Sequence, residues 1–244
     1  SANDGGGIRN ASGTLTLTDA TIFGNSARYG AGIFNYGGTV VMIDTEISGN
    51  SAEGDSPQGG GIYNSNFGSV TLTNSQMSGN SASYGGGIYS HSGGLTFTNT
   101  TISNNAAAQD GGGIYSFIHT ASALHNSTVA GNSADNVGGG ILAMYGRLTL
   151  NNSIVSLNEA PNNADVDGSY TSHVSLVGTD PGFVRDPSPG NDGDWATSDD
   201  DYGDLRIALA SSPAVDAGDN ALLPIDAFDL DEDGDFGELL PVDH

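Results

Sequence analysis

Residues 59–90 read GGGIYNSNFGSVTLTNSQMSGNSASYGGGIYS and end on the pattern with which they began. The stretch has three short parts: a glycine run that ends in Ile, the alternating segment VTLTN, and the segment MSGNSA. A period of 20 to 50 residues is typical of solenoids and other repeat folds. Aligning the whole chain on the glycine run finds six copies of the unit, at Ile8, Ile33, Ile62, Ile88, Ile114 and Ile141.

The three parts of each unit are short, and the middle part alternates apolar and polar residues, which indicates strands joined by turns. Identical residues recur at a nearly fixed distance, so we expect each strand to pair in parallel with its equivalent one turn away. The sequence therefore predicts an all-β parallel β-helix of about six recognisable coils, about 29 Å long at roughly 4.8 Å per coil. Four apolar columns would fill its narrow interior, among them Leu17, Met42, Leu72, Phe97, Leu124 and Leu150.

Two polar columns repeat as regularly as the apolar ones. Asparagine at a tight corner satisfies backbone groups and tolerates left-handed torsions, and stacked amides bond along an axis. We therefore interpret both columns as structural ladders and predict no catalytic residue in either. The first column is Asn25, Asn50, Asn80, Asn105, Asn132 and Asn158, and the second is Asp19, Asp44, Asn74, Asn99, Asn126 and Asn152.

The charge is strongly negative and unevenly spread. The chain of 244 residues has 29 Asp and Glu against five Arg, which gives a formal charge of −24. Residues 165–244 hold 20 of these acids. Because phosphates and anionic lipids require basic surfaces, we expect no nucleic-acid partner and no membrane insertion in this segment. We divide the chain into repeats at residues 1–160 and a segment at residues 161–244 with the last coil or coils and an acidic, calcium-binding cap.

The motifs GGGIYN, LTLTN and ISGNSA resemble the repeats of right-handed parallel β-helix surface proteins of bacteria, including polymorphic outer-membrane-protein-like repeats. The tail, with DPGFV and SPAVDAGD, is similar to the closing segment of secreted β-helix proteins of the choice-of-anchor type. The resemblance implies a right-handed coil, export, and a surface-exposed or adhesive role. It implies no defined ligand.

The sharpest candidate for chemistry is DLDEDGDFGE, residues 229–238. Alternating carboxylates followed by glycine open the calcium loops of EF-hands, where they converge on one hard cation. A solvated acidic turn is the alternative. The predicted Ca²⁺ ligands are Asp229, Asp231, Asp233, Asp235 and Glu238. A second acidic cluster, residues 189–204, has irregular spacing, and we interpret it as a charged surface loop in which Trp195 and Tyr202 pin the loop to the rod.

Some β-helix folds degrade polysaccharides, so an enzyme is an alternative. Lyases of this shape use a Lys or Arg base, and hydrolases need two or three carboxylates on one face. Lys is absent, and the three Arg of the repeats, Arg9, Arg28 and Arg147, fall in different coils. Glu53 and Asp55 form a candidate pair, although their insertion explains polar residues without function. We predict a protein that is not an enzyme.

The sequence thus predicts a non-catalytic extracellular or cell-surface β-solenoid that acts as an adhesive or stalk module. Its expected partners are other copies of itself, host or cell-surface proteins, or glycans. Two alternatives remain open. Because no cap precedes the first coil in this sequence, the chain is also compatible with a fibre subunit that stacks through its ends. The other alternative is a protein that binds or degrades polysaccharides.

Overall fold

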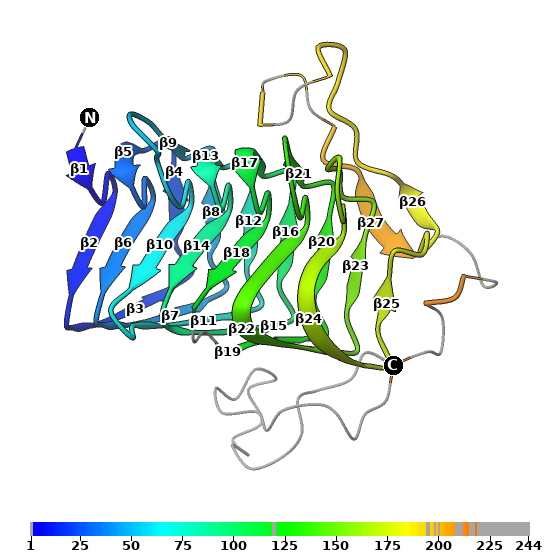
Figure 1. The fold of residues 1–244 in the computed structure, drawn as a ribbon, viewed down its shortest axis with the longest axis horizontal. Helices are drawn as coiled ribbons and strands as arrows, with labels where there is room; N and C mark the ends of the chain where they lie inside the picture. Colours follow the sequence, from blue (N-terminus) through cyan, green and yellow to red (C-terminus); the bar gives the residue numbers. More distant parts are fainter. Residues whose placement is uncertain are drawn as a thin grey trace.

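The computed structural model describes residues 2–118, 121–193, 196, 197, 199, 201–207, 212–214 and 218. In this part the chain winds into a parallel β-helix built entirely of strands and turns (Figure 1). Three parallel sheets run along its length, and sheet C contributes one strand to each of seven coils. The prediction of an all-β solenoid is confirmed. The seventh coil falls in the segment for which we expected the last coil or coils.

Every strand pairs with its equivalent in the next coil. Sheet A contains β1 (Ala2–Asp4), β5 (Ser26–Tyr29), β9 (Ser51–Ala52), β13 (Ser81–Tyr84), β17 (Ala106–Asp110) and β21 (Ser133–Ala134). The first row of sheet B contains β2 (Ile8–Ala11), β6 (Ile33–Tyr36), β10 (Ile62–Ser65), β14 (Ile88–His91) and β18 (Ile114–Phe117). Its second row contains β3 (Thr14–Thr18), β7 (Thr39–Ile43), β11 (Ser69–Thr73), β15 (Gly94–Thr98) and β19 (Ala121–His125).

The long strand β22 (Ile141–Asn151) joins the two rows of sheet B, and β24 (Val166–His173) pairs with it in the seventh coil. Sheet C contains β4 (Thr21–Phe23), β8 (Glu46–Ser48), β12 (Gln76–Ser78), β16 (Thr101–Ser103), β20 (Thr128–Ala130), β23 (Ile154–Ser156) and β25 (Leu176–Val177). The register matches the sequence repeat, with Leu72 opposite Met42 on one side and Phe97 on the other. Like residues therefore stack on like.

Each full coil contains four strands where the sequence predicted three. The segment read as a single third strand, such as ISGNSA at residues 47–52, is divided between sheets C and A. Gly49 at its centre has a φ of 60°, a left-handed torsion that no strand residue adopts. A short strand therefore ends before the Gly-Asn pair, the chain turns a corner, and a second strand begins after it.

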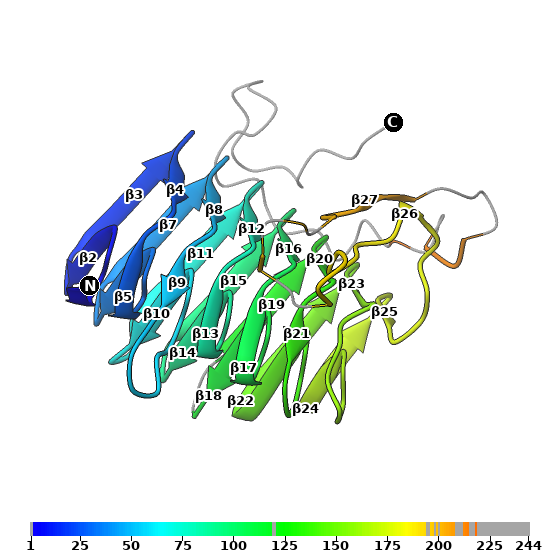
Figure 2. The same cartoon turned by 90° about the horizontal axis from the view of Figure 1, so that it is seen from above.

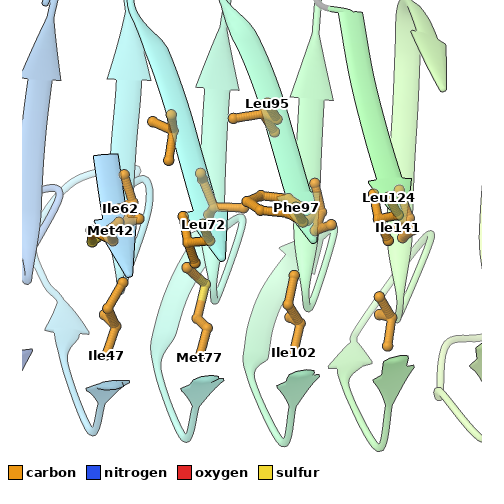
Figure 3. Packing of buried hydrophobic residues seen from close by; sticks show 14 of the residues in the cluster. Met42, Ile47, Ile62, Leu72, Met77, Leu95, Phe97, Ile102, Leu124 and Ile141 are labelled. Carbon is orange, nitrogen blue, oxygen red and sulfur yellow. The ribbon is translucent and has the colours of Figure 1, made fainter. Parts of the chain in front are cut away.

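The aliphatic core is one residue wide in each column and continuous from the first coil to the last (Figure 3). Side chains from sheets B and C meet in the space between them, as Phe97, Leu72 and Ile102 do in Figure 3. Phe97 is fully buried, and so are its column neighbours Leu72 and Leu124. Because the interior is this thin, a coil buries its core residues only against the coils on either side of it.

The first polar column forms an amide ladder inside the corner between sheets C and A. The side-chain oxygen of Asn105 accepts bonds from the backbone N–H and the side-chain amide of Asn80, at 3.0 and 2.9 Å. Its own amide donates to Asn132 at 2.9 Å. At the lower end the Asp165 carboxylate takes the place of an asparagine and accepts two bonds from Asn158. Each coil is thereby tied to the next by charge-neutral bonds that are shielded from water.

The second polar column lies at the corner between sheets B and C, and its main feature is backbone geometry. All six residues have φ between 47° and 50°, in the left-handed region that Asn and Asp tolerate best. Asn99 donates to Asn74 at 3.1 Å. The lateral bonds at this corner come mainly from hydroxyl groups one residue further on, since the Ser127 and Ser153 oxygens accept from the backbone N–H of the preceding coil at 3.2 Å each.

The described part of the C-terminal segment folds back beside the last coils (Figure 2). Strands β26 (Phe183–Arg185) and β27 (Asp204–Ile207) form a short antiparallel pair. The segment contacts the corner glycines of the solenoid, because a Cβ added to Gly131 would lie 2.7 Å from Pro187 and one added to Gly79 would lie 2.8 Å from the Tyr202 hydroxyl. Tyr202 therefore packs on the rod, as the sequence predicted for the second acidic cluster.

Candidate functional site

The predicted calcium loop, with Asp229, Asp231, Asp233, Asp235 and Glu238, lies outside the described residues. The calcium site therefore stays a prediction. Among the residues that the structure does describe, no three His, Asp or Glu side chains come close enough to form a metal site.

The second acidic cluster is held by protein donors wherever it is described. Asp199 accepts from the backbone N–H of Asn191 and from the hydroxyl of Thr197, and these bonds lower its pKa. Asp201 pairs with Arg185 at 2.8 Å. Asp204 accepts a bond from Arg206, which lowers the pKa of this carboxyl to about 2. These bonds use the carboxylates to fix the loop, which agrees with our interpretation of a charged surface loop.

The candidate pair for hydrolysis, Glu53 and Asp55, lies at the edge of sheet A, where the Asp55 backbone carbonyl accepts a bond from the Arg28 guanidinium at 3.0 Å. A hollow of about 760 Å³ opens further along the same sheet. Small residues line most of it, with carboxylates from Asp135 and Glu159, and its described lining includes no Arg or His. Neither place combines a base with an opposed acid in the described residues.

The most distinctive surface of the molecule is aromatic and lies on the outer side of the first row of sheet B. Its centre is a column that we call the aromatic ladder: Phe34, Tyr63, Tyr89 and Tyr115. Phe34 and Tyr63 stack at 5.2 Å between ring centroids, Tyr63 and Tyr89 at 5.6 Å, and Tyr89 meets Tyr115 edge-on at 5.0 Å. The ladder follows the coil repeat because equivalent strands lie about 4.8 Å apart.

The rings of the ladder cover one another. Tyr89 is only 6% exposed although it stands on the outside of the sheet. Burial raises the pKa of the Tyr63 and Tyr89 hydroxyls and raises that of Tyr115 to about 12. The ladder is thus a second, external core, whose ring faces are occupied by neighbouring rings and whose hydroxyls stay neutral at physiological pH.

A second column of rings stands beside the ladder, at the bend between the two rows of sheet B. It has one ring in each coil from the second to the sixth, and we call it the exposed ring row. Phe117 lies 5.4 Å from His91 and 6.1 Å from Tyr145. Tyr36 is 47% exposed, Phe67 79% and Tyr145 77%. The row consists of Tyr36, Phe67, His91, Phe117 and Tyr145.

Two members of the row have an unfavourable backbone conformation. Phe67 has a φ of 61° and Tyr145 a φ of 59°, both in the left-handed region. In the second coil the same bend is made by Gly37, for which this region carries no steric cost. For a bulky L-residue the conformation costs about 1–2 kcal/mol. Such strain, at rings that are largely exposed, marks the bend as a candidate functional site.

Two of the repeat arginines lie on the aromatic surface, although the sequence analysis treated them as isolated. The Arg9 guanidinium stands 5.5 Å from the centre of the Phe34 ring, and Arg28 stands 5.0 Å from that of Tyr29. Both distances fall within the range of cation–π contacts. Arg9 also approaches Asp4 at 4.0 Å. The cations therefore extend the aromatic surface at its N-terminal end.

The sequence analysis did not find the aromatic surface, although the signal was present. Phe34, Tyr63, Tyr89 and Tyr115 each follow directly after the inward Ile of the glycine run, and strand alternation places the next residue outside. The ladder could have been predicted from this pattern. The exposed ring row could not, because its members come from two different sequence positions, the last residue of a strand and the turn after it.

The sequence profile described as the right handed beta helix region matches residues 5–178, well over half of the chain. The chain belongs to this family. Membership confirms the right-handed winding that the resemblance implied, and the matched range ends where β25 completes the seventh coil. The match does not extend to polymorphic outer-membrane-protein-like repeats or to a choice-of-anchor segment, which stay predictions.

Searches of curated proteins and of solved structures find no match to this chain. Among the described residues, no helix is long and apolar enough to span a membrane.

Proposed function

We propose that this chain is a non-catalytic module of an extracellular or cell-surface protein, in which the β-solenoid acts as a stiff stalk and its aromatic surface as the adhesive face. The observation that carries the proposal is the exposed ring row. Exposed aromatic side chains contribute little to folding but supply large, rigid contact areas to a partner. Their position on one side of a rod makes them accessible along its length.

The ladders support the stalk role. Backbone bonds join every coil to the next in three sheets, and the buried amides of Asn80, Asn105 and Asn132 add bonds in the same direction. Pulling or bending the rod must break these bonds together, and proteases find few unpaired backbone segments in it. Both properties suit a spacer that works outside the cell.

A bead assay tests adhesion and catalysis together. Beads that carry the full chain should adhere to cells or extracellular matrix, and the chain should release no new reducing or unsaturated ends from a panel of polysaccharides. Release of such ends would overturn the non-catalytic proposal. Electron micrographs of the purified chain provide a separate test, because monodisperse rods fit a stalk whereas filaments would favour the fibre alternative.

Calcium in the loop of residues 229–238 is a further part of this proposal, and a chelator tests it. Ca²⁺ bound by the folded protein alone raises the melting temperature by mass action. We expect EDTA to lower the melting temperature of the wild-type chain and to leave an Asp231→Asn, Asp233→Asn variant unaffected. The paired control is Glu53→Gln with Asp55→Asn, which should respond as the wild type does. An unchanged wild-type melting curve would contradict the calcium site.

A further inference from the structure

The exposed ring row presents aromatic surface that the fold itself does not use. We infer that Tyr36, Phe67, His91, Phe117 and Tyr145 form the binding site for a neutral, linear polysaccharide that runs along the solenoid axis. The inference rests on the proposed adhesive role and names the chemistry of the partner.

Folding does not account for these residues. Phe67 and Tyr145 keep 79% and 77% of their surface in water, so they gain little from burial. Their left-handed torsions cost free energy that glycine at the same bend avoids, as Gly37 does in the second coil. Residues that lose stability without a packing gain are typical of functional sites.

The geometry suits a linear polymer of sugar rings. The row places one ring in each of five coils, which spans about 19 Å at roughly 4.8 Å per coil. Unlike the rings of the ladder, Tyr36, Phe67 and Tyr145 offer much of their surface to a ligand. The C–H faces of pyranose rings pack on aromatic faces, whereas their hydroxyl edges require polar partners or water.

Polar groups stand where such a chain needs them. A hollow of about 330 Å³ next to Tyr145 is lined by residues 142–146 and 167–169. It includes Asp167, whose carboxylate accepts a bond from Asn163 at 2.8 Å and retains further lone pairs as acceptors for sugar hydroxyls. This end of the row has the size and mixed character of a subsite for one sugar unit.

Charge selects a neutral polymer. The row itself contains no Asp, Glu or Arg, and the whole chain carries a formal charge of −24. A polyanion such as a uronate polymer would be repelled by this field. A polycation would be drawn to the acids of residues 165–244 in preference to the ring row. Stacking on uncharged sugar rings requires neither kind of charge.

The left-handed torsions allow an unusually clean test. Replacing Phe67→Gly and Tyr145→Gly removes two rings at positions where glycine is the residue that the backbone favours, so the double variant should fold at least as well as the wild type. The matched control is Phe23→Thr, which removes a 70% exposed ring from sheet C, away from the row. Affinity electrophoresis of the full chain in gels of cellulose derivatives, xylan, mannan, polygalacturonate or alginate measures binding.

We expect retardation by at least one neutral polymer and by neither acidic one. The double variant should bind about tenfold more weakly with an unchanged or higher melting temperature, and Phe23→Thr should bind as the wild type does. Wild-type chain that no neutral polymer retards, or a double variant that is retarded equally, would overturn the inference. So would self-association that the double variant loses in sedimentation, since the row would then join copies of the chain.

The two proposals fail differently. Beads that adhere to cells while no neutral polymer retards the chain would remove the polysaccharide and leave the adhesive role in place. Beads that do not adhere, with a chain that still binds a neutral polymer, would remove the adhesive role alone.

Discussion

The inner core and the outer aromatic surface of the solenoid follow the same coil repeat but obey different rules. In the inner core every coil supplies a residue of the same kind at the same position, and Phe97 and its neighbours are fully buried. On the outside the ladder is nearly as regular, whereas the exposed ring row changes residue type and even sequence position from coil to coil. Regularity thus follows burial, and the least regular rings are those that folding needs least.

The largest effect should come from the inner core. Phe97→Ala leaves a cavity between Leu72 and Leu124 that the thin interior cannot fill, so we expect a loss of about 4 kcal/mol in the free energy of unfolding. Denaturant melts measure it. Thr96→Ala, on the exposed side of the same strand, is the control and should change stability by less than about 0.5 kcal/mol. Equal effects at both positions would break the distinction between inside and outside.

The amide ladder ranks next. Asn105→Ala removes the acceptor of two bonds from Asn80 and leaves the Asn132 backbone and amide positions without one of their partners, all in a corner closed to water. We expect a loss of about 2–3 kcal/mol because buried polar groups become unsatisfied. Urea unfolding measures the loss. Asn136→Ala, at an exposed amide, should have a much smaller effect, and a ladder variant no worse than this control would contradict the structural role of the column.

The outer ladder should reveal itself through pH. Tyr115 has a pKa of about 12 in the folded chain, above the value of about 10 in an unfolded chain, and that of Tyr89 is also raised. The folded state therefore holds these protons more tightly, and stability should fall as the pH rises from about 10 to 12. Denaturation midpoints across this range measure the fall. A Tyr89→Phe, Tyr115→Phe variant should lose less stability, and an identical fall in both proteins would contradict external burial.

The smallest effect, and the one of opposite sign, belongs to the exposed row. Phe67→Gly relieves a left-handed torsion, and we expect a gain of about 0.5 kcal/mol after the entropy of glycine in the unfolded chain is subtracted. Phe67→Ala removes the same ring but keeps the strain, so it should be about 1 kcal/mol less stable than the glycine variant. Thermal melts of the pair measure the difference. A glycine variant that is less stable than Ala would show that the ring supports the fold.

The sequence predicted the stacking of coils, the inward columns and the position of the asparagine ladder at residues such as Asn80 and Asn105. It missed the fourth strand of each coil because the four letters around Gly49 and Asn50 look continuous in sequence, and only the torsion at Gly49 separates them. It also left Arg9 isolated, since nothing in the spacing of Arg9 and Phe34 shows that the two side chains meet across coils.

The amino-acid sequence by itself determined the parallel winding, because each coil contacts only the next and a periodic chain therefore specifies a periodic structure. It also determined which side chains point inward, since burial in a core one residue wide admits few alternatives. Only the tertiary structure decided which outer residues gather into one surface. Residues from a strand end and from the turn after it became neighbours at the bend of sheet B, and that meeting depends on the path of the backbone through three dimensions.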